Sequence, residues 1–209
     1  MAHVRVAVRV RPLSSRERRE GAKIIVNGDD RNVTIQDIRV PEHPGCDHRA
    51  RYKHFRLDEC FFSDGERASQ QEQVYASLGR PLLDDVLAGY NGCLLAYGQS
   101  GSGKTYTMLG NPELLQKLSA AGSECTMSLS CVEVYNETVR DLLMRRPQGL
   151  RVREHPQTGP YVQGLGMHLV SCAAELRSLL TRGMSRRQVG ATQLNGASSR
   201  SHALVTREG

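Results

Sequence analysis

The sequence predicts an α/β fold, a three-layer domain built on a central sheet that is mixed and mostly parallel. Two observations lead to this prediction. Short apolar or β-branched runs are interspersed with segments that repeat apolar residues at helical spacing. One continuous apolar run, Cys93–Tyr97, is followed directly by a glycine-rich loop, as expected of a strand buried on both faces. The length of 209 residues favours a single domain over residues 1–209.

The first part of the chain is expected to be rich in strands. Val4–Val10 alternates apolar residues with arginines and ends before Pro12, which has no N–H for a ladder. The charged segment Ser14–Gly21 is expected to be an exposed loop, and Pro41–Ala50 has loop composition. Further short strands are expected at Lys23–Val26, Val33–Ile38 and Phe55–Phe61.

A helix is expected to begin after Ser69 and to reach Gly89. Ser69 is followed three residues later by Glu72, which is the capping-box pattern. Apolar residues then recur at helical spacing at Val74, Leu78, Leu82, Val86 and Leu87. Pro81 lies inside this run and is expected to kink the helix or to break it locally.

The second part mixes strands and helices. A helix is expected to begin at Thr105, directly after the glycine-rich loop. Met127–Tyr135 is expected to be a strand, and Ala173–Arg182 a helix because its leucines share one face. Shorter strands are expected at Val139–Leu143, Leu150–Val152 and Tyr161–Val162.

Composition and charge are those of a folded protein, with 39% apolar and 24% charged residues. The 28 basic and 22 acidic residues give a net charge of +6. This favours an acidic partner such as nucleic acid, anionic lipid or an acidic filament surface, and a solvated basic face is equally compatible. No run reaches the roughly 18 apolar residues of a membrane span, and the N-terminus has no apolar leader, so a soluble protein is expected.

The six cysteines form no CxxC pair, and several lie in apolar runs. They are therefore expected to be reduced thiols of a cytosolic protein. Cys46 and His48 are close in the sequence, but two ligands in a polar loop do not make a metal site.

The glycine-rich loop is the first segment that indicates chemistry. Gly98–Thr105 follows the pattern GxxxxGK[ST], in which glycines let backbone N–H groups wrap phosphate oxygens. In such loops the lysine, here Lys104, reaches the β- and γ-phosphates, and the following hydroxyl, here Thr105, is a natural Mg²⁺ ligand. ATP with Mg²⁺ is therefore expected, although ATPases, GTPases and kinases all use loops of this kind.

A second polar segment, Asn195–His202, places small hydroxyl donors around Arg200. By itself it is compatible with a turn capped by serine and asparagine side chains. Beside a phosphate-binding loop, hydroxyls of this kind can instead order around a γ-phosphate and its metal ion.

The order of these motifs resembles the kinesin motor domain, which has a P-loop NTPase-type fold. The resemblance is strongest at Ala96–Met108, which contains the loop, and at Asn195–His202, the family's switch I motif. Further matching segments, in chain order, are Val8–Pro12, Gln73–Tyr75, Gly89–Gly92, Glu133–Glu137 and Asp141–Leu143. The lead-in Gln193–Asn195 and the early loop that contains Pro41 resemble the cargo-transporting kinesin-3 group.

The resemblance implies a site for ATP and Mg²⁺. Arg9, Arg11 and Pro12 would line one side of the adenine pocket, and Tyr106 would stack on the other side. Thr105 and Ser199 would lie near Mg²⁺. The phosphates would be held by the loop residues Gly98, Gln99, Ser100, Gly101, Ser102, Gly103, Lys104 and Thr105.

The resemblance also implies catalytic roles. With Lys104, the serines of the second segment would close over the γ-phosphate and help to place the attacking water. These serines are Ser198, Ser199 and Ser201. Arg200 would pair with a glutamate of a later motif, and Arg187 would lie near the phosphate exit route. Glu133 is expected to stabilise the sheet rather than to touch ATP.

The implied function is ATP hydrolysis coupled to movement along microtubules in the cytoplasm and cytoskeleton. Tubulin's surface is acidic, which suits the basic balance, and neither nucleic acid nor membrane insertion is expected. Some basic residues would lie near the family's microtubule contact region, although a solvated basic face is equally compatible. They are Arg145, Arg146, Arg151 and Arg153.

Two departures from the family pattern support an alternative. No DxxGxE sequence, the family's switch II pattern, occurs in the 209 residues, and the stretch from Gly110 to Met127 is shorter than in the family. The family pattern therefore stops after switch I, and a partial motor domain is expected. The alternative function is a non-catalytic fragment that binds nucleotide weakly or acts through protein interactions. A P-loop GTPase would carry an NKxD motif, which the sequence lacks.

Overall fold

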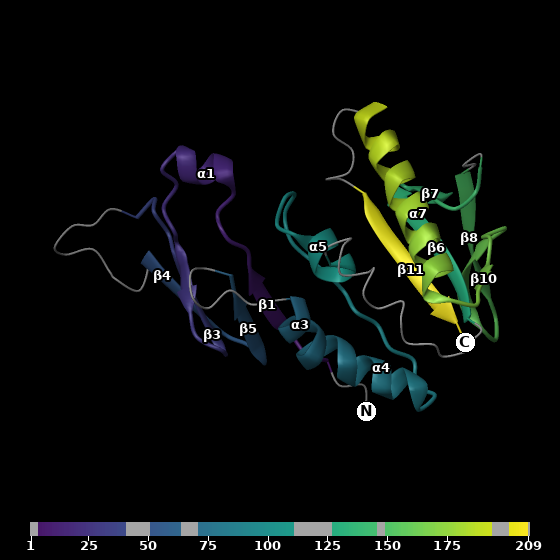
Figure 1. Cartoon of the computed structure of the whole chain (residues 1–209), viewed down its shortest axis with the longest axis horizontal. Coiled ribbons are helices and arrows are strands. Elements are labelled where there is room, and N and C mark those ends of the chain that lie inside the picture. The colour runs from purple at the N-terminus through teal and green to yellow at the C-terminus, as the bar shows by residue number, and fades with distance from the viewer. Residues whose placement is uncertain are drawn as a thin grey trace. The chain divides into compact units, whose positions relative to one another are not determined.

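The structure is a computed structural model that describes residues 4–40, 51–63, 71–110, 127–145, 149–193 and 201–208. These residues form two compact units, one over residues 1–96 and the other over residues 97–209. Their helices and strands are labelled in Figure 1. Each unit is described by itself.

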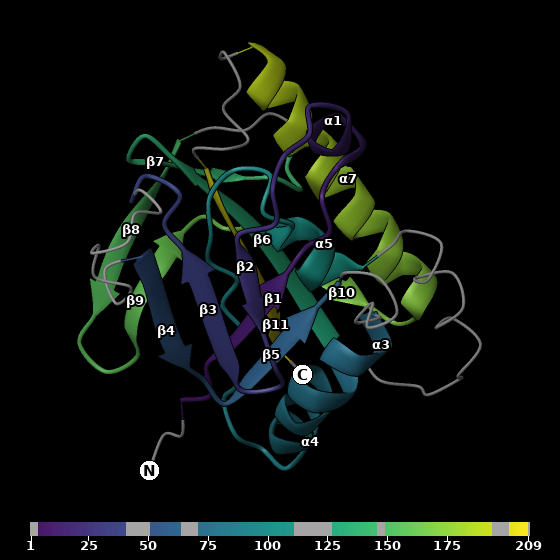
Figure 2. The ribbon, with the colours of Figure 1, turned by 90° about the vertical axis from the view of Figure 1, so that its left-hand side faces the viewer.

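Strands of the first unit form two small sheets. In one, β1 (Ala7–Val10) pairs in parallel with β5 (Glu59–Phe62). In the other, β3 (Asn32–Gln36) pairs antiparallel with β2 (Val26–Gly28) and β4 (Tyr52–Arg56), as Figure 2 shows. Buried apolar residues, Val33 of β3 and Cys60 of β5, indicate where the core of this unit lies.

The helical part of the first unit changes its geometry near Pro81. An α-helical turn, α3 (Gln71–Val74), is followed by a π-helical turn, η2 (Tyr75–Gly79), and then by α4 (Arg80–Leu87). Pro81 has no N–H to give to the carbonyl of Ser77, four residues earlier. That carbonyl accepts a hydrogen bond from Arg5 Nη1 at 3.1 Å. The helix is thus locally altered before Pro81, as a π-helical turn whose Ser77 carbonyl is bonded by Arg5.

The second unit is built on a six-stranded antiparallel sheet. Its central strand is β6 (Met127–Tyr135), which pairs along one edge with β11 (His202–Glu208). The other edge pairs with β10 (His168–Val170) at one end and β7 (Thr138–Asp141) at the other. The sheet continues through β8 (Gly149–His155) to β9 (Gly159–Gln163).

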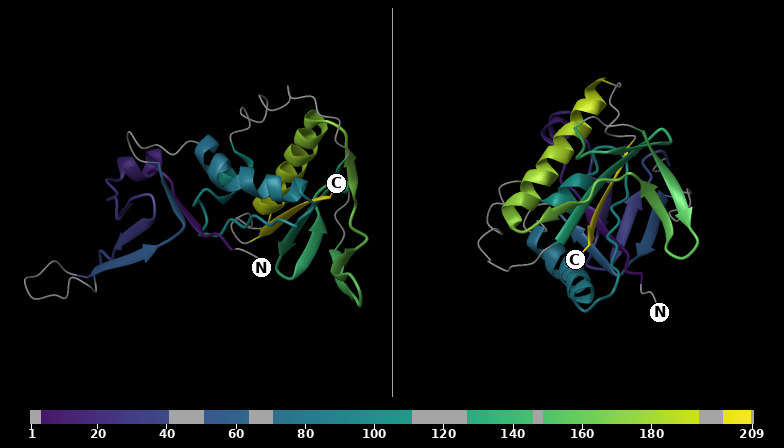
Figure 3. Two further views of the ribbon diagram at one scale, coloured as in Figure 1. Left: turned by 90° about the horizontal axis from the view of Figure 1, so that it is seen from below. Right: turned by 90° about the vertical axis from the view of Figure 1, so that its right-hand side faces the viewer.

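One long helix, α7 (Ala173–Gln193), packs on a face of this sheet (Figure 3). Side chains alternate in direction along a strand, so Leu129 and Cys131 of β6 point to the same face. Both are buried, at 1% and 0% exposure. Apolar residues of α7 pack against them and their neighbours: Leu176, Leu179, Leu180 and Met184. The core of the second unit therefore lies between β6 and α7.

A tight hairpin joins β6 to β7. Tyr135 pairs with Thr138, which leaves Asn136 and Glu137 as a two-residue loop. Both loop residues have positive φ angles, 46° and 59°. This is the conformation of a type I′ turn, which matches the twist of the flanking strands.

Much of the predicted secondary structure is confirmed. Met127–Tyr135 is a strand over the expected residues, and the helix predicted from Ala173 extends eleven residues further, to Gln193. The strand expected at Phe55–Phe61 is divided into β4 and β5. Neither β10 nor β11 was predicted. The expected helix start at Ser69 and the loop Pro41–Ala50 lie outside the described residues.

Some local expectations were wrong. Of the strand expected at Lys23–Val26 only Val26 lies in a strand, β2. Ser14–Gly21 is not a loop, because Ser14 caps a short helix, α1 (Ser15–Arg19). Cys93–Tyr97 forms no strand, and Leu95 and Tyr97 are 85% and 96% exposed. A strand buried on both faces needs partners along both of its edges, and no described strand pairs with this run.

Strand direction in the described ladders is mostly antiparallel. The α/β class is confirmed, but among the described ladders only the pair β1–β5 is parallel. Short loops such as Asn136–Glu137 join sequential strands of the second unit, and such loops enforce antiparallel pairing. Within the part of the chain that the structure describes, no helix is long and apolar enough to cross a membrane.

Candidate nucleotide site

The glycine-rich loop has the backbone that a phosphate cradle requires. Gly101 and Gly103 have φ angles of 74° and 95°, in the left-handed region that other residues rarely adopt. Gly98 has a φ angle of 155°, which other residues also rarely adopt, and a Cβ there would lie 2.7 Å from Ser102 Oγ. The backbone conformation of the loop therefore favours glycine at all three positions.

Lys104 begins the helix α5 (Lys104–Leu109) and folds back over the loop. Its Nζ donates hydrogen bonds to the carbonyls of Gly98 and Gln99, each at 2.8 Å. The loop itself is closed by a hydrogen bond of 3.2 Å from the Ser102 N–H to the Gln99 carbonyl. The Lys104 ammonium is thus held against the loop backbone, which is the arrangement of charge and shape that a polyphosphate fits.

Thr105 and Tyr106 follow Lys104 in the first turn of α5. The Thr105 side chain is exposed, so its hydroxyl is accessible to a hydrated metal ion. Tyr106 is 51% exposed, which leaves much of its ring open for stacking. Both side chains are therefore compatible with the roles that the sequence suggests for them.

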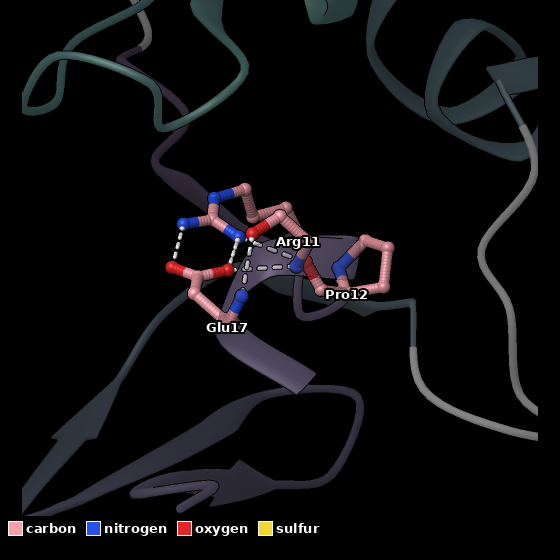
Figure 4. A network of polar contacts seen from close by, with 4 residues as sticks. Arg11, Pro12 and Glu17 are labelled. Atoms are coloured by element: carbon pink, nitrogen blue, oxygen red, sulfur yellow. Dashed lines mark hydrogen bonds and ion pairs between the residues drawn. The ribbon is translucent and has the colours of Figure 1, made fainter. Parts of the chain in front are cut away.

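The residues expected beside adenine belong to the first unit. Arg9, in β1, donates a hydrogen bond of 2.7 Å to Gln71 Oε1. Arg11 makes two hydrogen bonds to the Glu17 carboxylate, at 2.7 and 2.6 Å, and a third to the Pro12 carbonyl at 2.9 Å (Figure 4). The Arg11 guanidinium is thus fixed in one orientation by a paired contact that only arginine can make.

Glu17 also closes a capping box at the start of α1. Its carboxylate accepts the Ser14 N–H at 2.7 Å, and its own N–H donates to Ser14 Oγ at 3.2 Å. The hydrogen bonds from Arg11, followed by those from Ser14, hold the pKa of Glu17 far below its usual range. The pKa of Arg11 is raised, chiefly by its hydrogen bonds to Glu17. The Ser-x-x-Glu spacing of Ser14 and Glu17 is a sequence signal for this cap, which the expectation of a loop overlooked.

Most of the second polar segment is not described. Ser198, Ser199 and Arg200 lie outside the described residues, and their predicted roles stay predictions. Ser201 is described and is 7% exposed. Its Oγ accepts a hydrogen bond of 3.1 Å from Arg187 Nε, and its carbonyl accepts one of 2.9 Å from Arg187 Nη2. The structure therefore joins two residues that the family resemblance placed separately, Ser201 over the γ-phosphate and Arg187 near the phosphate exit route.

Glu133 completes this contact. Its Oε1 lies 3.7 Å from Arg187 Nε, and the two side chains are 9% and 14% exposed, respectively. The sequence contained a signal for this pair. Glu133 continues the inward alternation of Leu129 and Cys131, and Arg187 lies one turn after Gly183 on the inward face of α7. Sequence reasoning assigned Glu133 to the sheet alone and missed its contact with Arg187.

The described part of the chain contains no cluster of side chains that could bind a metal ion without a nucleotide. No three His, Cys, Asp or Glu residues there are grouped to hold a metal ion. The described cysteines are free thiols, buried at Cys60 and Cys131 and exposed at Cys93 and Cys172. Burial is the main reason that the pKa of Cys131 is raised to about 11. Cys46 and His48 lie outside the described residues.

Comparison with known protein families shows to which family the chain belongs. The family model described as the kinesin motor domain matches residues 9–208, which is nearly the whole chain. The chain belongs to the kinesin motor domain family. Its solved kinesin relatives include KIF14 in a dimeric state with AMP-PNP and in complex with a microtubule, at 38% identity and a TM-score of 0.79. A fast kinesin has the same TM-score at 30% identity.

Curated relatives of this kinesin chain are similar to it over almost its whole length. StAR-related lipid transfer protein 9 of Mus musculus is 44% identical over 229 residues, and Kinesin-like protein KIF16B of Homo sapiens is 40% identical over 228 residues. Each alignment covers 99% of this chain. Because an alignment of 229 residues exceeds the chain's 209 residues, at least 20 positions (229 − 209) of that relative have no counterpart here. The kinesin-3-like character of several relatives agrees with the subfamily resemblance.

The chain is much shorter than these relatives. It spans 5% of StAR-related lipid transfer protein 9 and 17% of KIF16B. Of the solved chains it spans 60% for KIF14, covering 99% of itself, and 58% for the fast kinesin, covering 98% of itself. Similarity therefore extends over the chain's whole length but over only part of each relative.

Proposed function

We propose that this chain is the nucleotide-handling part of a kinesin-like motor that couples ATP hydrolysis to movement along microtubules. The observation that carries the proposal is the loop geometry within a family match over residues 9–208. Gly101 and Gly103 adopt the required left-handed conformations, and Lys104 is held over the loop carbonyls.

The loop residues Gly98–Thr105 would bind the phosphates. Lys104 would exchange its carbonyl partners for phosphate oxygens, because hydrogen bonds between two charged groups are the stronger ones. Thr105, together with Ser199, would hold Mg²⁺, which supplies charge neutralisation at the phosphates. Arg9, Arg11, Pro12 and Tyr106 would contact the base.

The hydroxyl-rich segment would respond to the γ-phosphate. Ser198, Ser199 and Ser201 would close over it and help to place the attacking water, and Arg200 would contribute charge. Of these, Ser201 is held from the protein side by Arg187. Catalysis in this proposal rests on positioning and charge, and the protein forms no covalent bond to phosphate.

Microtubules are the proposed partner, in the cytoplasm and cytoskeleton. The solved KIF14 chains were determined in complex with a microtubule. The net charge of +6 suits an acidic filament surface. Exposed arginines of β8, Arg151 and Arg153, could supply part of the contact.

The test is nucleotide binding and turnover by the 209-residue chain and its Lys104→Ala variant. Wild type should bind a fluorescent ATP analogue in the presence of Mg²⁺, and the variant should bind it at least about tenfold more weakly, since it loses a charged hydrogen bond. Added microtubules should raise phosphate release by wild type only. Equal binding by wild type and variant would show that the loop is not the nucleotide site.

A second candidate is nucleotide binding without turnover. It is favoured by one observation, that no DxxGxE sequence lies within the 209 residues. In this case Lys104→Ala would still weaken binding, but microtubules would not raise phosphate release above that of the variant. The same two measurements therefore separate a motor, a binding fragment and a chain without a nucleotide site.

A further inference from the structure

Three elements of the second unit bring complementary polar groups together at one buried point. Arg187 comes from α7, Glu133 from β6, and Ser201 from the residue that precedes β11. Arg187 donates to both the hydroxyl and the carbonyl of Ser201, at 3.1 and 2.9 Å. Its Nε also lies 3.7 Å from Glu133 Oε1. One guanidinium therefore connects a helix, the central strand and the end of the hydroxyl-rich segment.

The backbone on both sides of Arg187 and Glu133 is fixed. Gly183, one helical turn before Arg187, lies so close to the sheet that a Cβ there would be 3.4 Å from Cys131 Sγ. On the sheet, Ala203 of β11 is paired directly with Glu133. Neither α7 nor β11 can shift without disturbing buried packing, so the distance between Arg187 and Ser201 is set by the fold.

A buried guanidinium needs a negative partner, because transfer of an isolated charge from water is costly. At this point Glu133 provides a negative partner, because its carboxylate forms an ion pair with Arg187. Ser201 offers two neutral oxygens, which orient the guanidinium but do not neutralise it. Loss of the charge on Glu133 should therefore weaken the hold of Arg187 on Ser201.

We propose that Glu133 is a positioning residue of the nucleotide site: it holds Arg187 in place, and Arg187 fixes Ser201. The proposal rests on the proposed function in one respect, the contact of Ser201 with the γ-phosphate. Glu133 itself touches no nucleotide. It acts through Arg187, and its effect should therefore appear in the discrimination between ATP and ADP rather than in nucleotide affinity as a whole.

The experiment compares Glu133→Gln with Glu154→Gln, the same substitution at an exposed position of β8. Hydrogen–deuterium exchange of the individual backbone amides of residues 201–205, followed by NMR, reports on local opening of the segment that Arg187 holds at Ser201. Exchange should be about tenfold faster in Glu133→Gln, because hydrogen bonds from a charged donor are lost. It should be unchanged in Glu154→Gln.

The second readout is the ratio of the affinities for ATPγS and ADP with Mg²⁺. Glu133→Gln should lower this ratio by about three- to tenfold, whereas a purely structural role would weaken both nucleotides equally. Arg187→Lys keeps the charge but cannot reach both oxygens of Ser201 from two nitrogens. Arg187→Lys should therefore lower the ratio of the two affinities as well. Its backbone amides at residues 201–205 should exchange more slowly than those of Glu133→Gln.

Each outcome of these measurements supports or overturns the proposed role of Glu133. Unchanged exchange and an unchanged ratio in a folded Glu133→Gln variant would overturn the proposal, as would an equal loss for both nucleotides. If Glu133→Gln does not fold, Glu133→Asp retains the charge at a greater distance and should exchange faster than wild type; wild-type exchange in that variant would count against the proposal. A wild-type chain that binds neither nucleotide would overturn the proposed function, while the exchange measurement would still decide whether Glu133 fixes Ser201.

Discussion

Single glycines determine the shape of the phosphate loop. Gly103 has a φ angle of 95°, and a Cβ built there would meet nothing within 4 Å, so only backbone conformation requires glycine. We expect Gly103→Ala to destabilise the chain by about 1 kcal/mol, the cost of a left-handed alanine. We also expect it to weaken nucleotide binding, as measured by titration with a fluorescent ATP analogue.

Gly21 provides a matched control for this prediction. Its φ angle is 67°, and a Cβ there also meets nothing within 4 Å, but Gly21 lies outside the loop. Gly21→Ala should therefore lower the melting temperature by a similar few degrees and leave nucleotide affinity unchanged. Equal losses of affinity in the two variants would mean that Gly103 acts only through stability.

Glu17 should make the chain sensitive to acid. Its pKa is lowered by Arg11 and Ser14 in the folded state, so its carboxylate contributes stability above the ordinary glutamate pKa of about 4.3. That contribution is lost as pH falls through the lowered pKa. We expect wild type to be more stable than Glu17→Gln at pH 7, and the difference between their melting temperatures to shrink steadily below about pH 4.

The control for the acid prediction is Glu20→Gln. Glu20 pairs with Arg16 at 2.8 Å, but the two side chains are 58% and 80% exposed, respectively. Exposed pairs of this kind contribute little, so the melting temperature of this variant should follow that of wild type at every pH. A Glu17→Gln profile parallel to wild type would show that the Arg11 contact does not stabilise the fold.

At the scale of elements, the β6–β7 hairpin contains a residue that its turn disfavours. A type I′ turn needs positive φ at both loop positions, and Glu137 adopts 59° at the second position, where glycine is preferred. Glu137→Gly should therefore raise stability by up to about 1 kcal/mol, or roughly 2–4 °C in melting temperature. Thermal unfolding followed by circular dichroism measures this directly.

Glu154→Gly is the comparison for the hairpin prediction. Glu154 is exposed within strand β8, where glycine has no side chain to pack and loses more backbone freedom on folding. This variant should lower the melting temperature. The sign of the change should thus differ between the two positions, and a fall in both would contradict the assignment of strain to Glu137.

Elements whose signals are local were predicted well. Met127–Tyr135 alternates and contains β-branched residues, and its bounds follow from those features. The predicted helix ends at Arg182, just before Gly183, whereas α7 continues through this glycine to Gln193. The lack of a side chain at Gly183 serves close packing on Cys131, which only the partner strand reveals.

Pairing could not be predicted in the same way. The apolar composition of Cys93–Tyr97 indicates that its side chains favour burial. A strand also needs a neighbouring strand to pair with, and that neighbour comes from a different part of the sequence. At the site, the loop conformation and Lys104 followed from a contiguous motif. The contact of Arg187 with Glu133 and Ser201 joins three separate segments, so it became visible only in the folded unit.

At the scale of the whole molecule, the net charge of +6 bears on association. If microtubules are the partner, binding should weaken as ionic strength rises from 50 to 150 mM, because the Debye length falls to about 8 Å. Replacing Arg151 and Arg153 together by Gln should weaken cosedimentation between about twofold and tenfold, the range expected for two exposed charge contacts.

A second pair of exposed arginines separates local from overall charge. Arg16 and Arg19 lie in α1 of the first unit, and replacing both by Gln lowers the net charge by the same amount. If β8 makes the contact, this control should cosediment like wild type. An equal loss in both double variants would indicate that overall charge, and not the β8 hairpin, attracts the filament.

The π-helical turn before Pro81 has an evolutionary consequence. The Ser77 carbonyl receives from Arg5, at 3.1 Å, a hydrogen bond of the kind that Pro81 cannot supply. Positions 5 and 81 should therefore vary together among descendants of a common ancestor. Lineages that replace the proline regain a main-chain donor and become free to lose the arginine, whereas lineages that keep the proline should retain a long donor side chain at position 5.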